Sequence, residues 1–384
     1  MNSIFEEFLK QNCCGCGACS VICPQKAITM LYDSHGFLYP YLDKNKCVNC
    51  GLCNNVCAFK EYKSIQNDFV LSYAVRAKDN YELMTSRSGG FFSVLSRYIL
   101  KLGGVVFGCV EESPKVIKHC KIEKEDDIYL LKNSKYVQSN IENCFSECLE
   151  QLQKDKYVLF SGTPCQTHSM IYFLKFKHIN TAKLITVDIV CHGVPSPVLW
   201  GDYITYIESK YHKSVKKVNF RNKEDFGWKS HIETYYFTDN TSISFNKWAS
   251  AFYEHNMFRE SCYNCKYTTI NRISDITIAD YWGIEKITNS FNDDKGVNLV
   301  ILHNEKAKQL FENISDDIVL EKTQIEQSLQ PNLVRPSKKG DKYSKFWNDY
   351  ANLSSTKFFK KYFFNSYFAK IIRKIKHIVN KKSD

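Results

Sequence analysis

The sequence CCGCGACSVICP occupies residues 13–24, and a related stretch, CVNCGLCNNVC, occupies residues 47–57. Both contain cysteines at the spacing C-x2-C-x2-C-x3-C, the bacterial pattern for holding two [4Fe–4S] clusters. Three closely spaced thiolates can cover one face of a cubane cluster, whereas the fourth lies too far along the chain and binds the other cluster. The pattern therefore predicts two one-electron carriers near the N-terminus.

The two predicted ligand sets exchange their fourth cysteines. One set is Cys13, Cys16, Cys19 and Cys57, and the other is Cys47, Cys50, Cys53 and Cys23. Zinc is the alternative, but it prefers four ligands per ion from paired C-x2-C units rather than triplets with a distant fourth ligand. Ala58 replaces the proline that usually follows the second run, and Cys14 is a further thiol with no predicted role.

The composition indicates a folded protein of two or three domains. The chain has 384 residues, of which 44% are hydrophobic and 14% aromatic, so it can bury a large core. It has 17 cysteines, but the N-terminal stretch MNSIFEEFLK lacks the features of a secretory signal. Cluster-binding thiolates must also remain reduced. We therefore predict a cytoplasmic protein, and no apolar run is long enough to span a membrane.

The excess of positive charge lies at the C-terminus. From Lys357 onward there are nine lysines and arginines and one acidic residue, which leaves about +3 of the formal net charge of +11 for the rest of the chain. The body of the protein is therefore not expected to bind nucleic acid. Apolar residues recur at helical spacing between these basic residues, at Phe359, Tyr362, Phe363, Tyr367, Ile371, Ile375 and Ile378.

This pattern predicts a basic amphipathic tail over residues 341–384. Such a helix could lie on the anionic inner face of a membrane as a peripheral contact. The alternative is a helix that packs on the body of the protein or on a partner.

The remaining sequence predicts a mixed fold. Strands are expected over 69–77, 105–110, 157–160 and 184–190, with helices over 91–102 and about 166–176 and after Pro197. This alternation favours an α/β domain with a largely parallel sheet, whereas residues 215–248 resemble antiparallel strands. The fold class is thus a mixture of α+β and α/β, with a ferredoxin-like domain (1–62), the two parts of a second domain (69–155 and 156–340) and the tail.

A third group contains two cysteines that follow predicted strands and two that lie on a predicted loop. Cys165 and Cys191 each come just after a strand, and the carboxyl ends of parallel strands share one edge of a sheet. Cys262 and Cys265 form a C-x2-C pair, which is a chelating spacing. These four residues could form a third metal site, for which zinc and iron are equally compatible with the spacing.

The turn Ser88-Gly89-Gly90 opens a predicted helix. Its free backbone N–H groups and the helix dipole suit a phosphate or pyrophosphate, with Arg87 as a counter-charge. An ordinary serine-capped helix start explains the turn equally well. The chain contains no G-x-G-x-x-G fingerprint, so a Rossmann nicotinamide site has no support.

Several other residues have structural explanations. His192 could donate a proton at a cofactor, but a role in orienting its loop is the simpler interpretation. Asp280, Tyr281, Trp282 and Gly283 could shape a substrate entrance or pack in the core. Four further cysteines are interpreted as core thiols, namely Cys109, Cys120, Cys144 and Cys148.

These motifs together resemble one protein family. The matching stretches are CCGCGACSVICP (13–24), GFLYP (36–40), SRSGGFFS (86–93), SKYVQS (134–139), LFSGTPCQ (159–166), CHGVPSP (191–197), SCYNCKY (261–267) and DITIADYWGI (275–284). From about residue 11 to 333, the chain resembles the beta subunit family of coenzyme F420-reducing hydrogenase and F420H2 dehydrogenase, in its bacterial form with an N-terminal ferredoxin domain.

The resemblance implies a third [4Fe–4S] cluster on Cys165, Cys191, Cys262 and Cys265, beside a flavin, usually FAD. The residues that it implies for the flavin pocket are Ser88, Gly89, Gly90, Ser134, Lys135, Tyr136, Gly162, Thr163 and Gln166. Relatives more often have serine where Arg87 stands, and a basic residue near Thr268.

The function implied is that of an iron–sulfur flavoprotein oxidoreductase that passes electrons between ferredoxin-type clusters and a flavin. Its partners would be a ferredoxin or another redox protein and a small organic substrate, either F420 or another acceptor. Bacterial relatives often lie among polysaccharide-biosynthesis genes, which suggests a pathway. The alternatives are an electron-transfer adaptor subunit without its own substrate and a protein that keeps its clusters for structure or sensing.

Overall fold

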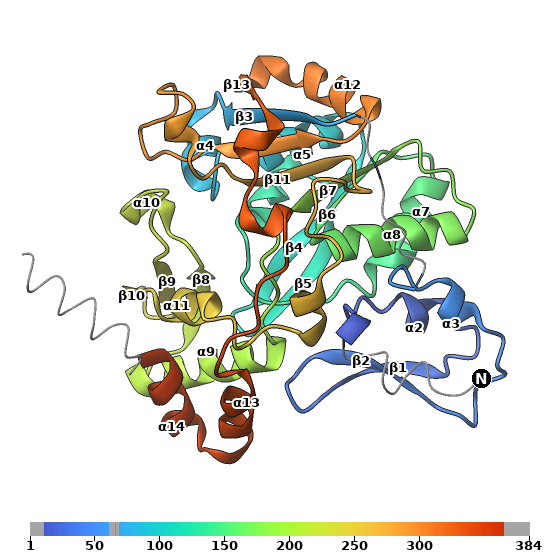
Figure 1. The fold of residues 1–384 in the computed structure, drawn as a ribbon, viewed down its shortest axis with the longest axis vertical. Coiled ribbons are helices and arrows are strands. Elements are labelled where there is room, and N and C mark those ends of the chain that lie inside the picture. Colours follow the sequence, from blue (N-terminus) through green and yellow to red (C-terminus); the bar gives the residue numbers. More distant parts are fainter. Residues whose placement is uncertain (1–10, 61–65, 67–68, 365–384) are drawn as a thin grey trace, which may run out of the picture.

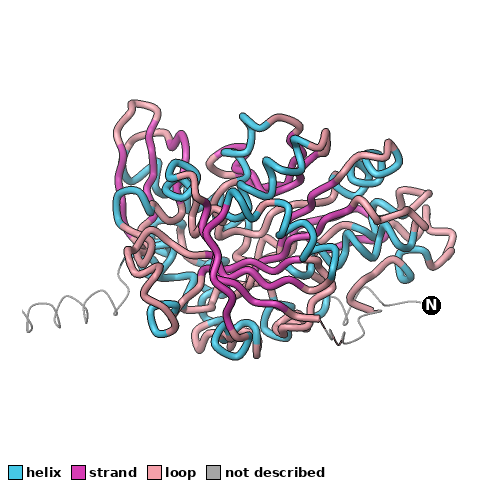
Figure 2. Tube along the Cα trace, turned by 90° about the horizontal axis from the view of Figure 1, so that it is seen from above, coloured by secondary structure: helices cyan, strands magenta, loops and turns pink. Residues whose placement is uncertain are grey.

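The computed structural model describes residues 11–60, 66 and 69–364 (Figure 1). A small N-terminal unit lies beside a large mixed sheet that has helices on both of its faces, and a second, three-stranded sheet lies at the other side (Figure 2). The predicted combination of a ferredoxin-like unit with a mixed sheet is confirmed.

The N-terminal unit is an internal repeat. Its elements are α2 (Ala18–Ile22), β1 (Ile28–Tyr32), β2 (Leu38–Leu42) and α3 (Leu52–Asn55), with β1 and β2 antiparallel. Each short helix begins after a glycine in the left-handed region, Gly17 at φ 86° and Gly51 at φ 77°. Glycine adopts this conformation without the steric cost of a Cβ atom, so the chain can turn sharply within each cysteine run.

The large sheet has eight strands in the order β13-β3-β12-β11-β7-β6-β4-β5. Their bounds are β3 (Leu71–Ala77), β4 (Val105–Ser113), β5 (Val116–Ile122), β6 (Val158–Gly162), β7 (Leu184–Ile189), β11 (Ile276–Asp280), β12 (Asn298–Leu302) and β13 (Ile318–Thr323). Only the central pairs β11–β7, β7–β6 and β6–β4 are parallel. The expectation of a largely parallel sheet is therefore wrong for the outer strands, because β5, β12, β3 and β13 join antiparallel.

Helices cover both faces of this sheet. The main ones are α4 (Asn80–Thr85), α5 (Phe91–Lys101), α6 (Ile128–Leu131), α7 (Cys144–Gln153), α8 (Pro164–Phe176) and α12 (Glu305–Asn313). Neighbouring strand residues point to opposite faces, so Val105 and Phe107 pack with α7 and α8 whereas Val106 packs with α5. Cys144 and Cys148 are buried in the α7 layer, as expected for core thiols, whereas Cys109 and Cys120 are only half-buried.

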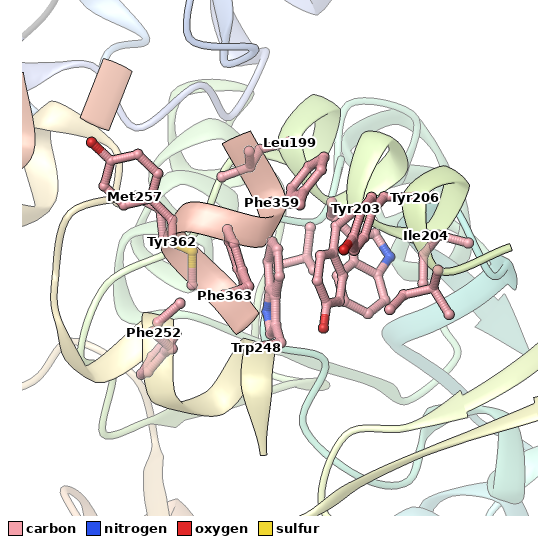
Figure 3. Packing of buried hydrophobic residues seen from close by; sticks show 14 of the residues in the cluster. Leu199, Tyr203, Ile204, Tyr206, Trp248, Phe252, Met257, Phe359, Tyr362 and Phe363 are labelled. Atoms are coloured by element: carbon pink, nitrogen blue, oxygen red, sulfur yellow. The ribbon is translucent and has the colours of Figure 1, made fainter. Parts of the chain in front are cut away.

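The predicted antiparallel region forms the second sheet. Its strands are β8 (Val215–Asn219), β9 (Glu233–Phe237) and β10 (Ser242–Phe245), in the order β10-β9-β8. The helices of this part are α9 (Pro197–Tyr211), α10 (Lys223–Phe226), α11 (Lys247–Tyr253), α13 (Tyr343–Asn352) and α14 (Ser355–Phe359), followed by a π-helical turn (Lys360–Phe364). They enclose an aromatic core (Figure 3).

The described part of the C-terminal tail belongs to that core. Phe359 and Phe363 are buried and lie against Tyr203, with ring centroids 5.5 and 5.0 Å apart, and Phe363 also stacks on Trp248 (Figure 3). For these residues the chain packs on its own body and does not offer a membrane-binding face. Tyr367, Ile371, Ile375 and Ile378 lie outside the described residues. Within the part that is described, no helix is both long and apolar enough to cross a bilayer.

Replacing Phe359 tests this packing. Phe359→Ala is expected to lower the free energy of unfolding by about 3–5 kcal/mol, because it removes a ring from a closed core. Urea denaturation would measure the change, with Phe226→Ala as a control at a position that is 39% exposed. Equal stability of the two variants would contradict the buried position of the segment.

Candidate metal and cofactor site

The first cysteine set surrounds a small cavity. A hollow of about 60 Å³ is lined by Cys13, Cys16, Cys19 and Cys57, together with Cys53 of the other set. Burial raises the pKa of Cys57 to about 11, and the neighbouring thiols of Cys16 and Cys13 act in the same direction. The distant fourth cysteine thus lies beside the first three, which is the arrangement that the exchanged ligand sets require.

The second cysteine set is more exposed to solvent than the first, because it includes the exposed Cys50. Burial raises the pKa of Cys53, and charges on Cys50 and Cys23 raise it further, so the residue from the first run lies near the second run. Backbone N–H groups point at the sulfurs, with Ala27 N donating to Cys23 Sγ at 3.3 Å and Asn49 N to Cys47 Sγ at 3.4 Å. Such bonds favour thiolates and adjust the potential of a bound cluster.

The third group comes together at the edge of the parallel strands. Cys165 lies in the first turn of α8, Cys191 follows β7, and Cys262 and Cys265 belong to the 3-10 turn Glu260–Asn264 and the residue after it. All four line one cavity of about 40 Å³. Burial raises the pKa of Cys191 to about 12 and that of Cys265 to about 11, with the thiol of Cys165 contributing in both cases.

These thiols fit a cluster chemically, because four sulfur donors converge from segments far apart in sequence. Burial raises the pKa of Cys191, Cys262 and Cys265, whereas a hydrogen bond with Cys14 lowers the pKa of Cys165. Binding of a cluster would therefore release protons from the first three thiols. Among the described residues, no three or more His, Cys, Asp or Glu side chains are arranged to hold a single metal ion.

One arginine joins the first and third groups. Arg259 is 1% exposed, and its Nε donates to Cys13 O at 2.6 Å and its Nη2 to Leu38 O at 2.8 Å. Its Nη1 donates to Gln138 Oε1 at 3.2 Å, and its guanidinium lies 4.0 Å from the ring centre of Tyr39. The side chain thereby fixes the N-terminal unit to the large domain.

Sequence reasoning did not identify Arg259. It also lines the cavity of the third cysteine group, where its positive charge faces Cys262. A Cβ atom on Gly15 would lie 2.7 Å from Arg259 Nη1, so the glycine leaves space for the guanidinium. The only sequence signal was a basic residue three positions before a C-x2-C pair.

Cys14 lies between the same two groups. It is buried and lines both the cavity of the first set and that of the third. Gln138 Nε2 donates to its carbonyl oxygen at 2.7 Å, and its Sγ lies 3.9 Å from Ser169 Oγ. The two cavities are therefore separated by little more than this residue.

A larger cavity of about 260 Å³ opens beside the third group. It lies beyond the carboxyl ends of β6, β7 and β11, the edge at which ligands bind to open α/β sheets. Eight residues expected around a flavin line it, namely Ser88, Gly90, Ser134, Lys135, Tyr136, Gly162, Thr163 and Gln166. Gly89 instead packs on β3, where an added Cβ atom would lie 2.2 Å from Val75 O.

Several of these side chains are already bonded within the protein. Lys135 Nζ donates to three backbone carbonyls, including Cys109 O at 2.8 Å. Ser88 Oγ donates to Val297 O at 2.6 Å. Thr163 and Gln166 form a capping box at the start of α8, which begins at Pro164, two residues earlier than predicted. Their role is to shape the cavity wall.

The polar atoms that remain without partners come from other residues. Arg87 Nε and Nη1, His119 Nδ1 and Asn133 Oδ1 are buried, line the cavity, and have no hydrogen-bond partner among the described residues. Burial lowers the pKa of His119 to about 4, so the ring is neutral near pH 7. A largely apolar cavity with a few free polar atoms is the usual form of a small-molecule site, and these residues fit a flavin.

Two stacked tryptophans lie beside the cavity, and Trp282 is part of its lining. Trp228 and Trp282 stack with ring centroids 4.8 Å apart and an angle of 5° between planes. Asp280 accepts from Trp228 Nε1 at 2.9 Å and from Arg221 Nη1 at 2.6 Å. Asp280 and Trp282 thus line the cavity, whereas Tyr281 is buried away from it in the core. That the first two residues shape a substrate entrance stays a prediction.

Removing Arg259 tests the contact between the units. Arg259→Ala is expected to cost about 3 kcal/mol of unfolding free energy, since it removes the donor to the carbonyl oxygens of Cys13 and Leu38. Hydrogen exchange in β1 and β2 should accelerate. Arg335→Ala, at an exposed position, is the control. Unchanged exchange in the Arg259 variant would contradict the role assigned to this residue.

Comparisons with known proteins agree with these features. Residues 155–328 match the family model for the C terminus of the coenzyme F420 hydrogenase/dehydrogenase beta subunit, and residues 12–60 match a 4Fe-4S dicluster domain. No curated protein matches the chain.

One solved structure, a xenon derivative of the F420-reducing [NiFe] hydrogenase complex from Methanosarcina barkeri, contains a chain that aligns at 16% identity and a TM-score of 0.46. The alignment covers 78% of this chain and 92% of that one. Residues 155–328 thus match the C terminus of the coenzyme F420 hydrogenase/dehydrogenase beta subunit, and the 4Fe-4S dicluster domain ahead of them indicates an iron–sulfur electron-transfer protein similar to that type.

Proposed function

We propose that this protein is an iron–sulfur flavoprotein oxidoreductase that passes electrons between three [4Fe–4S] clusters and a flavin, with FAD as the expected form. The clusters would be held by the three cysteine groups, and the flavin by the large cavity. The observation that carries the proposal is the position of Cys191, which lines both the cavity of the third group and the large cavity.

A continuous series of sites supports the proposal. Cys14 borders the first and third groups, and Cys191 borders the third group and the large cavity. Thr163 and His192 also line both of the latter cavities. Electron transfer requires such short separations, whereas separate structural metal sites have no need of them.

A flavin, when bound, exchanges a hydride with an organic substrate and single electrons with an iron–sulfur centre. The chain's own residues would enclose the bound flavin and offer it hydrogen bonds. Tyr136, Phe252 and Trp282 line the cavity and exclude water from it. His119 is neutral and donates or accepts at Nδ1, while its Nε2 lies 2.8 Å from Ser161 O.

The substrate would be F420 or another small organic acceptor, with a ferredoxin or similar redox protein at the N-terminal unit. A role within polysaccharide biosynthesis follows from the resemblance alone. The second candidate is an adaptor that hands electrons to a partner enzyme. Cys50 is exposed, which favours electron exchange with a partner protein at the second cysteine set. Both the enzyme and the adaptor would exchange electrons there.

Metal analysis tests the third site. The anaerobically purified protein should contain about twelve irons per chain, and Cys262→Ser should lower this by about four. Cys120→Ser, which changes a half-buried thiol in β5, should leave the iron content unchanged. Zinc in place of iron, or equal iron in the two variants, would refute a third cluster.

Turnover separates the enzyme from the adaptor. The isolated chain, supplied with FAD and reduced ferredoxin, should reduce F420 or another acceptor if it is the enzyme. Activity only after a partner enzyme is added would identify the adaptor. Absence of flavin from the purified protein, together with no binding of added FAD, would refute the flavoprotein assignment.

A further inference from the structure

One cation that lines the large cavity, Arg87, has donor groups without a hydrogen-bond partner among the described residues. Arg221 is paired with Asp280 at 2.6 Å, and Lys132 with Glu82 at 2.6 Å. Lys135 is surrounded by backbone carbonyls. Arg87 takes part in none of the ion pairs found among the described residues, although it is only 7% exposed.

Only part of the hydrogen-bonding capacity of the Arg87 guanidinium is used within the protein. Its Nη2 donates to Trp228 O at 2.6 Å and weakly to Ser230 O at 3.4 Å, which fixes its direction. Nε and Nη1 have no partner in the described part of the chain. These two groups lie on different edges of the guanidinium, and each of them can donate a hydrogen bond to an oxyanion in the cavity.

The turn that carries Arg87 is held rigidly. Gly89 and Gly90 pass close to β3, where no Cβ atom would fit beside Val75 O, and Lys223 Nζ donates to Ser88 O at 2.8 Å. The turn leads into the 11-residue helix α5, whose N-cap Gly90 offers no side-chain cap. Asn298 Oδ1 accepts from Phe91 N at 3.1 Å, but the positive end of the helix still faces the cavity wall.

We propose that Arg87 and the start of α5 bind a phosphate-type oxyanion inside the large cavity. The inference rests on the proposed function in one respect, because it takes that cavity to be the cofactor and substrate site. Two sources share this chemistry: the phosphate groups of the flavin itself, and an anionic group on the substrate. A buried cation with two free donors and no carboxylate binds either one and disfavours a neutral group.

Pyrophosphate is the direct probe. Wild-type protein should bind it with an affinity that Arg87→Gln lowers at least about tenfold, since a charge-assisted pair of hydrogen bonds is lost. The affinity of Arg87→Lys should fall between the two, because lysine keeps the charge but not the fixed planar array of donors. Arg335→Gln, at an exposed position, is the control and should bind as the wild type does. Calorimetry measures all four affinities.

Flavins distinguish the two sources. Quenching of flavin fluorescence gives affinities for riboflavin, FMN and FAD. A tenfold loss for FMN and FAD in Arg87→Gln, with riboflavin unchanged, assigns the subsite to the flavin phosphates. If Arg87→Gln lowers the affinity for pyrophosphate but not for FMN or FAD, the subsite is assigned to an anionic group of the substrate. If the wild type binds no flavin but Arg87→Gln still loses pyrophosphate, the proposed function fails and the anion site stands.

The inference is overturned if the wild type does not bind pyrophosphate, or if Arg87→Gln binds it equally well. Arg87→Ser serves in case the glutamine variant does not fold, because it removes the charge with a smaller side chain. Thermal unfolding of the wild type supplies an independent measurement, since a specific ligand raises Tm in proportion to the logarithm of its concentration. No rise in the wild type would also overturn the inference.

Discussion

The parallel pairing of β6 with β7 is the contact on which the candidate site depends. It aligns Ser161 with Val187 and Gly162 with Asp188, so the two strands end at the same level. Cys165 and Cys191 leave the sheet just beyond this level and come within range of each other. A shift of the pairing by one residue would turn the side chains to the opposite face and separate the thiols.

A buried polar network holds β11 in place next to β7. Asp188 accepts from Thr277 Oγ1 at 2.6 Å, Ser274 Oγ at 2.7 Å and Arg272 Nη1 at 3.3 Å. The charged arginine compensates for the burial of the carboxylate, and the network ties the strand after the C-x2-C pair to the strand before Cys191. The same edge then carries both the third cysteine group and the wall of the large cavity.

Electrostatics divides the site into two regions. Around the cysteines, burial disfavours charged thiolates, and Arg259 supplies one fixed positive charge between the first and third groups. In the large cavity, three cations are satisfied by protein partners and Arg87 is not. A region lined by buried cysteines and a neighbouring cavity with an unpaired cation are compatible with the proposed redox unit.

The spacing of residues along the chain predicts much of the local structure of this molecule. The cysteine runs of the N-terminal unit could be predicted because their ligands lie within a few residues of each other, and the strand–helix alternation at residues 69–211 follows from short-range apolar patterns. Burial of Cys144 and Cys148 followed from their helical spacing. The antiparallel outer strands could not be predicted, because strand order depends on contacts between residues far apart in the chain.

Side-chain partners were likewise decided by the tertiary structure. The sequence alone determined that two four-cysteine sets and a third candidate group exist, because ligand chemistry is fixed by residue type and spacing. It did not reveal Arg259, which joins segments more than 200 residues apart. Nor did it reveal that Lys135 is bonded to backbone carbonyls, while Nε and Nη1 of Arg87 have no partner in the described part of the chain. Those outcomes depend on which groups meet after folding, and only packing in three dimensions sets that.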